Sequence, residues 1–175
     1  SMSDLLIGSK PAIQGRTSIT LEDYVTEIMA GGFPAMRMPL GRAHRATLDG
    51  YLNRIVDRDF PEAGQAVRKP DALKRWMIAY AAATATAASF ETIRDAATSG
   101  QREKPARTTT IPYRETLERL WIVDSIPAWL PTNNHLTKLT FGPKHHLADP
   151  ALAARLLGIS AEALLNGKSV GPTIP

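Results

Sequence analysis

The first stretch of the chain with regularly spaced apolar residues follows Thr20. These residues recur every three or four positions, which predicts an amphipathic helix with one apolar stripe. The stripe consists of Leu21, Val25, Ile28 and Met29. Thr20 and Asp23 have the spacing of a capping box, so the helix is expected to begin at this threonine. Gly31 and Gly32 predict its end, because glycine readily takes the left-handed conformation of a C-cap.

A second amphipathic helix is predicted between Arg42 and Arg58. Its apolar face is made of Leu48, Tyr51, Leu52, Ile55 and Val56. Pro61 is expected to stop the helix, because proline disfavours the helical conformation of the residue before it. The segment from Gly64 to Pro70 is then typical of a hinge between two parts of the chain.

Three further helices are predicted after this hinge, each with a residue that can cap its first turn. The capping residues are Asp71, Ser89 and Thr110. Pro112 falls in the first turn of the third helix, where its missing amide costs nothing. The buried stripe of that helix is expected to consist of Tyr113, Leu117, Leu120 and Trp121.

Short extended runs follow the third helix. The segments WIVDSIPAWLP (121–131) and KHHLAD (144–149) each predict a strand. Three helices followed by a two-stranded hairpin is the order of a winged helix-turn-helix. Asp149, Pro150 and Gly158 then mark the start and end of another helix, and Ser160 is expected to begin a short last one. The whole pattern predicts a mainly α (α+β) fold.

The composition narrows the classes of protein without choosing one. The chain has 175 residues, of which 43% are hydrophobic, so it can bury a core. The sequence has no cysteine, which excludes disulfides and thiolate metal sites and suits a cytoplasmic location. No apolar run approaches the length of a membrane span, and Ser1-Met2-Ser3 is typical of a cloning remnant rather than of a signal peptide. The net charge of +4 and the pI near 9.6 permit a polyanionic partner such as DNA.

Four segments carry a resemblance to a known family: GGFP (31–34), YLNRIVDRDF (51–60), TIPYRETLERLWIVDSIPAWLP (110–131) and PKHHLADPALAARLLG (143–158). In this order they resemble the C-terminal part of a bacterial and archaeal family of AAA-type ATPases, a region of unknown function. The resemblance implies a helical lid-like subdomain and then a winged helix, preceded in the full protein by a P-loop nucleotide-binding domain. In similar chains a segment with a nuclease-like signature follows. The implied division is a linker or tail (1–18), the lid-like subdomain (19–66), the winged helix (67–150), and terminal helices with a tail (151–175).

The chain lacks the phosphate-binding loop that ATP hydrolysis would need. That loop has the form G-x-x-x-x-G-K-S/T, in which backbone amides surround the phosphates. Gly167-Lys168-Ser169 matches its end, but Glu162 stands where the first glycine is required. We therefore predict no catalytic residue in this chain. ATP or ADP and magnesium would belong to the P-loop domain that the resemblance implies.

The segment Gly31-Gly32-Phe33-Pro34 has two interpretations. Signal-transduction ATPases have a Gly-x-Pro in their helical lid that packs on bound nucleotide, and Gly32-Phe33-Pro34 is similar to it. Glycine would let the backbone approach closely, and the proline ring would offer a flat apolar face to a base. Alternatively, the glycines end a helix, Phe33 fills the core and Pro34 blocks continuation. Both interpretations stay open.

Basic residues on and before the third helix of the predicted winged helix suggest contact with DNA. Arg114 and Arg119 are expected on the exposed side of the helix, where they would reach the major groove. Arg102, Lys104 and Arg107 precede it and could bind phosphates. However, Glu115 and Glu118 share the helix and would repel a DNA backbone. The alternative is a winged helix that contacts protein or acts as a spacer, with Arg114 and Glu118 as a surface pair.

Two acidic or histidine-containing clusters are interpreted as structural. His145 and His146 point to opposite faces of a strand, so they are not expected to ligate one metal ion together with Asp149. Asp57, Asp59 and Glu62 lie among arginines, which favours a solvated, salt-bridged helix face over acid-base chemistry. Trp129, between two prolines, is expected to be exposed and available for interaction.

Three functions remain after these exclusions. The first is a non-catalytic module that passes nucleotide-dependent movement of an ATPase domain in the same polypeptide to a partner. The second is a DNA-binding module, and the third is a structural or homo-oligomerisation domain. None of them requires a membrane.

Overall fold

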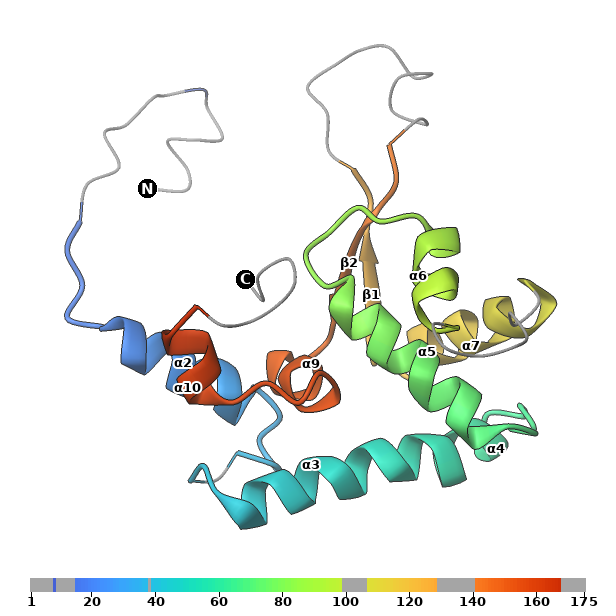
Figure 1. The fold of residues 1–175 in the computed structure, drawn as a ribbon, viewed down its shortest axis with the longest axis horizontal. Coiled ribbons are helices and arrows are strands. Elements are labelled where there is room, and N and C mark those ends of the chain that lie inside the picture. The colour runs from blue at the N-terminus through green and yellow to red at the C-terminus, as the bar shows by residue number, and fades with distance from the viewer. Residues whose placement is uncertain (1–7, 9–14, 38, 99–106, 129–140, 168–175) are drawn as a thin grey trace.

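The computed structural model describes residue 8 and residues 15–37, 39–98, 107–128 and 141–167. This part of the chain is mainly helical and contains a two-stranded antiparallel sheet, which confirms the predicted α+β class (Figure 1). The elements in chain order are α2 (Leu21–Ala30), α3 (Arg42–Arg54), the π-helical turn η1 (Ile55–Asp59), α4 (Phe60–Glu62), α5 (Pro70–Ala82), α6 (Phe90–Ala96), α7 (Arg107–Arg119), β1 (Val123–Ile126), β2 (Lys144–Leu147), α9 (Pro150–Leu156) and α10 (Ala161–Leu165). The strands pair from Val123 opposite Leu147 to Ile126 opposite Lys144.

Most of the predicted helix starts are confirmed. The Thr20 hydroxyl accepts from the amide of Asp23 at 3.1 Å, and the Asp23 carboxylate accepts from the amide of Thr20 at 2.7 Å. These two bonds form the predicted capping box of α2. Ser89, Asp149 and Ser160 likewise cap α6, α9 and α10 with their side chains.

Two predicted starts are wrong. Helix α5 begins at Pro70, one residue before Asp71, because the fixed φ of proline suits the first helical position. Helix α7 begins at Arg107, so Thr110 is no cap but a buried residue inside the helix, with 8% of its surface exposed. Pro112 consequently lies in the helix interior rather than at its start.

Pro61 does not stop the second predicted helix. Before it, the chain widens into the π-helical turn η1, in which the amide of Phe60 donates to the carbonyl of Ile55. Proline has no amide to donate and its ring would clash with the carbonyl four residues earlier in a regular α-helix. The wider turn takes that carbonyl out of α-helical register, and the helix continues to Glu62. Its C-cap residue is Ala63, and Gly64, with a φ of +82°, follows.

One hydrophobic core extends across the segment that was predicted to be a hinge. Ile55 and Phe60 before it, and Leu73 and Met77 after it, belong to the same buried cluster. The division into a lid-like subdomain and a winged helix stays a prediction, but the residues on the two sides of residues 64–70 pack together.

Helix α9 lies in the middle of the described structure and contacts α2, α3 and α5 (Figure 1). Ala151, Leu152, Ala153 and Ala154 are all at most 1% exposed. Four consecutive buried apolar residues cover most of the circumference of a helix, so this part of α9 belongs to the core, and the small alanines let the neighbouring helices approach closely.

Two residues that the sequence places on apolar helix stripes are exposed. Leu21 is 66% exposed on α2, and Trp121 is 84% exposed just after α7. Trp121 has a φ of +56° and occupies the left-handed position of a helix cap. In this cap the amide of Ile122 donates to the carbonyl of Leu117 at 2.9 Å. The turn therefore directs the chain into β1 and leaves the indole in solvent.

None of the helices in the described part of the chain combines the length and the hydropathy that a membrane span needs.

Candidate functional site

The segment Gly31–Pro34, which we call the corner, lies directly against Asp149, the N-cap residue of α9. The carboxylate oxygen Oδ2 of Asp149 accepts from the amide of Gly32 at 2.7 Å and from that of Phe33 at 3.1 Å. The other oxygen, Oδ1, accepts from the amide of Ala151 at 2.7 Å. Asp149 is only 2% exposed, so these three amides satisfy a buried carboxylate. The corner and the start of α9 thus form one hydrogen-bonded unit.

Gly31 is required where it stands. Its φ is +73°, and a Cβ atom at this position would lie 2.5 Å from Oδ1 of Asp149. Only glycine combines that backbone conformation with so close an approach. The prediction that Gly31 ends α2 is confirmed, and its amide donates to the carbonyl of Glu27 at 3.0 Å.

Arg37 holds the corner from its other side. Its Nη1 donates to the carbonyl of Gly31 at 2.8 Å, and its Nη2 donates to the carboxylate of Glu27. A cation at the end of α2 also complements the partial negative charge of a helix C-terminus. The guanidinium therefore braces the loop against the helix that precedes it.

Phe33 and Pro34 have different environments. The Phe33 ring is half-buried and packs on Tyr51 with ring centroids 5.7 Å apart. Pro34 is exposed, in a turn where the amide of Met36 donates to the carbonyl of Phe33 at 2.9 Å. The interpretation of Phe33 as a core residue is therefore supported, while the ring of Pro34 is free to touch another molecule.

The corner is not a phosphate-binding loop. The amides of Gly32 and Phe33 already donate to Asp149, whose negative charge would repel a phosphate. The corner therefore does not fit the phosphates of ATP or ADP. Of Gly167-Lys168-Ser169, the lysine and the serine lie outside the described residues.

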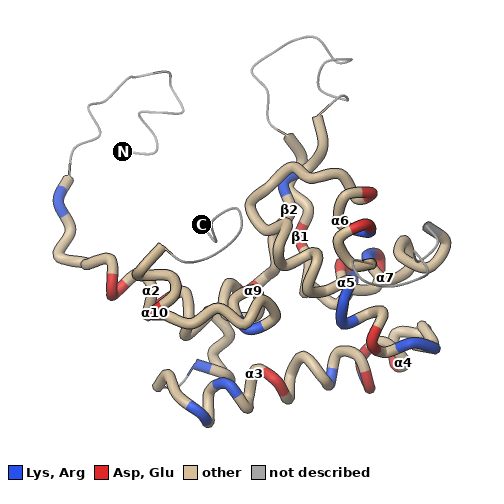
Figure 2. The backbone as a smooth tube through the Cα atoms, in the orientation of Figure 1, with Lys and Arg blue, Asp and Glu red and all other residues tan. Residues whose placement is uncertain are grey.

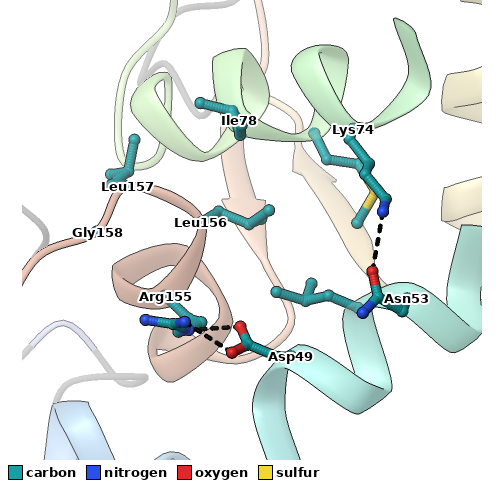
Figure 3. A pocket seen from close by; sticks show the side chains of 10 residues that line it. Asp49, Asn53, Lys74, Ile78, Arg155, Leu156, Leu157 and Gly158 are labelled. Atoms are coloured by element: carbon teal, nitrogen blue, oxygen red, sulfur yellow. Dashed lines mark hydrogen bonds and ion pairs between the residues drawn. The ribbon is translucent and has the colours of Figure 1, made fainter. Parts of the chain in front are cut away.

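A groove of about 610 Å³ runs between α3, α5 and α9 (Figure 3). At one end, Arg155 donates to both carboxylate oxygens of Asp49, at 2.6 and 2.7 Å. At the other end, Lys74 donates to the side-chain oxygen of Asn53 at 2.9 Å. Between these two pairs the lining is apolar and includes Leu52, Met77, Ile78, Leu156 and Leu157.

The two polar pairs of the groove join neighbouring helices: Arg155 and Asp49 connect α9 to α3, and Lys74 and Asn53 connect α5 to α3. The hydrogen bonds from Arg155 lower the pKa of Asp49, and the same carboxylate raises the pKa of Arg155. Both groups therefore stay charged at neutral pH and join α9 to α3. Neither is poised to exchange a proton, so the groove offers shape and apolar surface rather than acid-base chemistry.

A family match accounts for most of the chain. The model of the family described as Domain of unknown function (DUF8612) matches residues 21–163, from the first residue of α2 into α10. The chain belongs to this family. No curated protein and no solved structure matches it. The DUF8612 match contains the corner, Asp149 and the groove.

Of the residues predicted to contact DNA, the structure describes the side chains of only Arg114 and Arg119. Arg114 is not free on the surface: its guanidinium stacks 4.3 Å above the ring of Phe90 and lies 3.7 Å from Glu118. Arg119 is exposed and donates to the hydroxyl of Thr116 at 3.2 Å. Arg107 starts α7, but its side chain lies outside the described residues, as do Arg102, Lys104 and Trp129.

His145 has the structural role that the sequence suggested. It is fully buried, and its Nε2 lies 2.8 Å from the carbonyl of Ala88, an acceptor, so Nε2 carries the proton. Its Nδ1 then accepts from the Tyr80 hydroxyl at 3.1 Å. Burial lowers the pKa of His145 and raises that of Tyr80 to about 12. Both ring nitrogens are used in the core, and no group of three or more metal-ligating side chains occurs among the described residues.

Further polar contacts extend from Tyr80 towards the surface. The Tyr80 hydroxyl lies 3.5 Å from the hydroxyl of Ser125, which donates to Glu118 at 3.2 Å. This series links β1, β2, α5 and α7 through side chains. The pairs in this series are separated by 7, 45 and 65 positions in the sequence, and no local pattern signals the two long-range ones.

Proposed function

We propose that this chain is a non-catalytic module of an AAA-type ATPase, which couples the nucleotide state of a P-loop domain to a partner. The single observation that carries the proposal is the contact between the corner and Asp149. Pro34 is exposed on one side of the corner, while Gly32 and Phe33 are hydrogen-bonded to the first residue of α9 on the other. A P-loop domain that moves Pro34 would therefore pull on α9.

Helix α9 can carry that movement further. It contacts α3 and α5, and β2 leads directly into it. Its Arg155 is tied to Asp49 of α3 by two hydrogen bonds. In this proposal the helices and the hairpin that follow residue 70 form a winged helix, which delivers the movement to a partner protein. ATP or ADP and magnesium would be bound by the P-loop domain and not by this chain.

The proposal is tested in the natural polypeptide. Its coding sequence upstream of this chain is expected to contain the G-x-x-x-x-G-K-S/T loop. With the purified full protein, hydrogen exchange of the α9 amides would be compared in the ADP-bound and ATP-bound states. We expect a difference between the two states that Pro34→Ala abolishes, because the apolar contact of the proline ring with the nucleotide side is lost.

Pro39→Ala serves as the matched control, since Pro39 is an exposed proline just beyond the corner. It is expected to leave the exchange difference unchanged. An upstream sequence without a P-loop, or an exchange difference that persists in Pro34→Ala, would contradict the proposal.

A DNA-binding function is the second candidate, and the order α5, α6, α7, β1, β2 favours it. This is the order of a winged helix, in which α7 would be the recognition helix. Of the two α7 arginines predicted to reach DNA, Arg119 is exposed and Arg114 is packed on Phe90. DNA contact would therefore depend on Arg119 and on the basic residues before the helix.

Fluorescence anisotropy of a labelled duplex tests this candidate at low and near-physiological salt. Binding should weaken steeply with salt, because phosphate contacts release counterions. Arg119→Glu should weaken it further, whereas Arg42→Glu, an equal charge change on the exposed start of α3, should have a smaller effect. Absence of binding at low salt, or equal effects of the two variants, would exclude α7 as a DNA reader.

A further inference from the structure

The two ends of the groove between α3, α5 and α9 differ in charge. At one end the charges cancel, because Arg155 donates to both carboxylate oxygens of Asp49. At the other end Lys74 donates to a neutral acceptor, the side-chain oxygen of Asn53, at 2.9 Å. Lys74 forms no ion pair with a carboxylate in the part of the chain that the structure describes. Figure 2 shows the basic position on α9 close to the acidic position on α3, and a separate basic stretch on α5.

Asn53 adds hydrogen-bond donors beside the uncompensated charge of Lys74. Its side-chain oxygen already accepts from Lys74, so its Nδ2 group, with two protons, is left to donate. The Lys74 ammonium has three protons and uses one of them for Asn53. Both side chains lie at the same end of the groove (Figure 3). Together they can donate to the two oxygens of one anion.

The lining between the two polar ends is apolar and only partly covered. Leu52, Leu156 and Leu157 are half-buried, and Ile78 is 41% exposed. An apolar chain that lies here would remove from water side-chain surface that the folded chain leaves exposed. The groove therefore combines an apolar stretch with one cationic end.

We infer that this groove binds an apolar carboxylate of limited length, such as a medium-chain fatty acid. The carboxylate lies against Lys74 and Asn53, and the tail lies along the leucines towards the other polar pair. A charge-assisted hydrogen bond is stronger than one between neutral groups, so Lys74 sets the direction of the ligand. One cation matches the single charge of a carboxylate better than the nearly double charge of a phosphate.

The size and the ends of the groove favour a small ligand over a helix of another protein. Its volume of about 610 Å³ is typical of a small-molecule site. A partner helix of several turns would have to cross a polar pair at each end, with its apolar side facing charged groups. The inference does not depend on the proposed ATPase function, since it uses only the residues of this groove.

An amide NMR titration of the purified chain with sodium octanoate tests the inference. We expect saturable shifts at the residues that line the groove. The uncharged 1-octanol has the same tail and should bind at least about tenfold more weakly. From butanoate to octanoate, each further methylene should tighten binding by about fourfold, because it enters the apolar stretch.

Two substitutions separate the contribution of the charge from that of the apolar lining. Lys74→Met keeps an unbranched apolar side chain, so it should weaken octanoate binding by about tenfold and leave 1-octanol binding unchanged. Ile78→Ser should weaken the binding of both ligands, because it removes apolar surface from the groove. Lys144→Met and Ile126→Ser are the matched controls at exposed positions outside the groove, and they should bind both ligands as the wild type does.

Three results would overturn the inference. The first is the absence of saturable shifts at millimolar octanoate, and the second is a set of shifts centred on residues outside the groove. The third is equal octanoate affinity in the wild type and in Lys74→Met, which would show that no carboxylate lies at Lys74. Retained 1-octanol binding by Lys74→Met shows that the variant is folded, so a loss of octanoate binding alone supports the inference.

Discussion

The carboxylate of Asp149 lies 2.7 Å from the amide nitrogen of Gly32, although 117 positions separate the two residues. This bond and its neighbour at Phe33 join the segment after α2 to the start of α9. A carboxylate at a helix start is ordinary, since it caps the free amides of the first turn. Here the same side chain also accepts hydrogen bonds from the amides of a distant loop, so one residue stabilises both local and long-range structure.

Asp149→Ala should lower the free energy of unfolding by about 3 kcal/mol, because it removes the cap of α9 and leaves buried amides without an acceptor. Urea denaturation monitored by circular dichroism measures the loss. Asp57→Ala is the control at an exposed aspartate and should change stability by less than about 0.5 kcal/mol. Similar losses in the two variants would mean that the contact with the corner contributes nothing specific.

Gly31→Ala should destabilise the chain by at least about 2 kcal/mol, since alanine at a φ of +73° is strained and its Cβ would clash with Asp149. Gly50→Ala tests the opposite case. A Cβ at Gly50 meets nothing within 4 Å, and the residue lies inside α3. This substitution should therefore raise stability by about 0.5–1 kcal/mol. Thermal or urea unfolding of both variants measures the contrast, and a Gly31→Ala variant as stable as wild type would refute the close approach.

His145 should make stability fall as the pH falls. Burial lowers its pKa in the folded chain below the ordinary value of 6.5, so below pH 6.5 the unfolded chain binds the proton more readily. The contribution of neutral His145 to the free energy of unfolding is therefore fully present above pH 6.5. It is lost as the pH falls from there through the lowered pKa of the folded chain. The slope from one histidine cannot exceed about 1.4 kcal/mol per pH unit.

Urea midpoints between pH 8 and pH 5 measure this dependence in the wild type and in His145→Gln. The variant should be less stable at pH 8, because it loses the bonds to Tyr80 and Ala88, but its stability should fall less steeply with acid. Parallel curves for the two proteins would show that other groups cause the acid sensitivity.

Trp121→Gly should stabilise the chain by about 1 kcal/mol, because glycine relieves the left-handed conformation at a φ of +56°. Little packing is lost, since the indole is 84% exposed. Trp121→Ala is the sharp control: it removes the same ring but keeps a Cβ, so it should bring no such gain. Equal thermal midpoints for the two variants would show that the backbone at this residue is not strained.

Local rules predicted much of the fold. The capping box of α2, the caps of α6, α9 and α10, and the α+β class all follow from residues within a few positions of one another. Failures occurred where a local signal competed with something stronger. Pro61 was accommodated by a π-helical turn, and Trp121 entered a left-handed cap because the chain had to turn into β1.

The candidate site was less predictable than the fold. The sequence drew attention to Gly31–Pro34, but its partner Asp149 was interpreted only as a helix cap. Nothing in the spacing of a sequence reveals a contact across 117 positions. Arg114 was expected to be free for the same reason, since its stacking on Phe90 joins two helices that no local pattern relates.

The central position of α9 has a consequence for how the chain is made. The ribosome synthesises α2, α3 and α5 first, and the residues of α9 emerge more than a hundred positions after α2. At ordinary rates of translation this delay lasts on the order of ten seconds. Throughout that time the sides of α2, α3 and α5 that contact α9 in the folded chain have no α9 to pack against. The native packing of α2, α3 and α5 is completed only when α9 has been synthesised and packs against them.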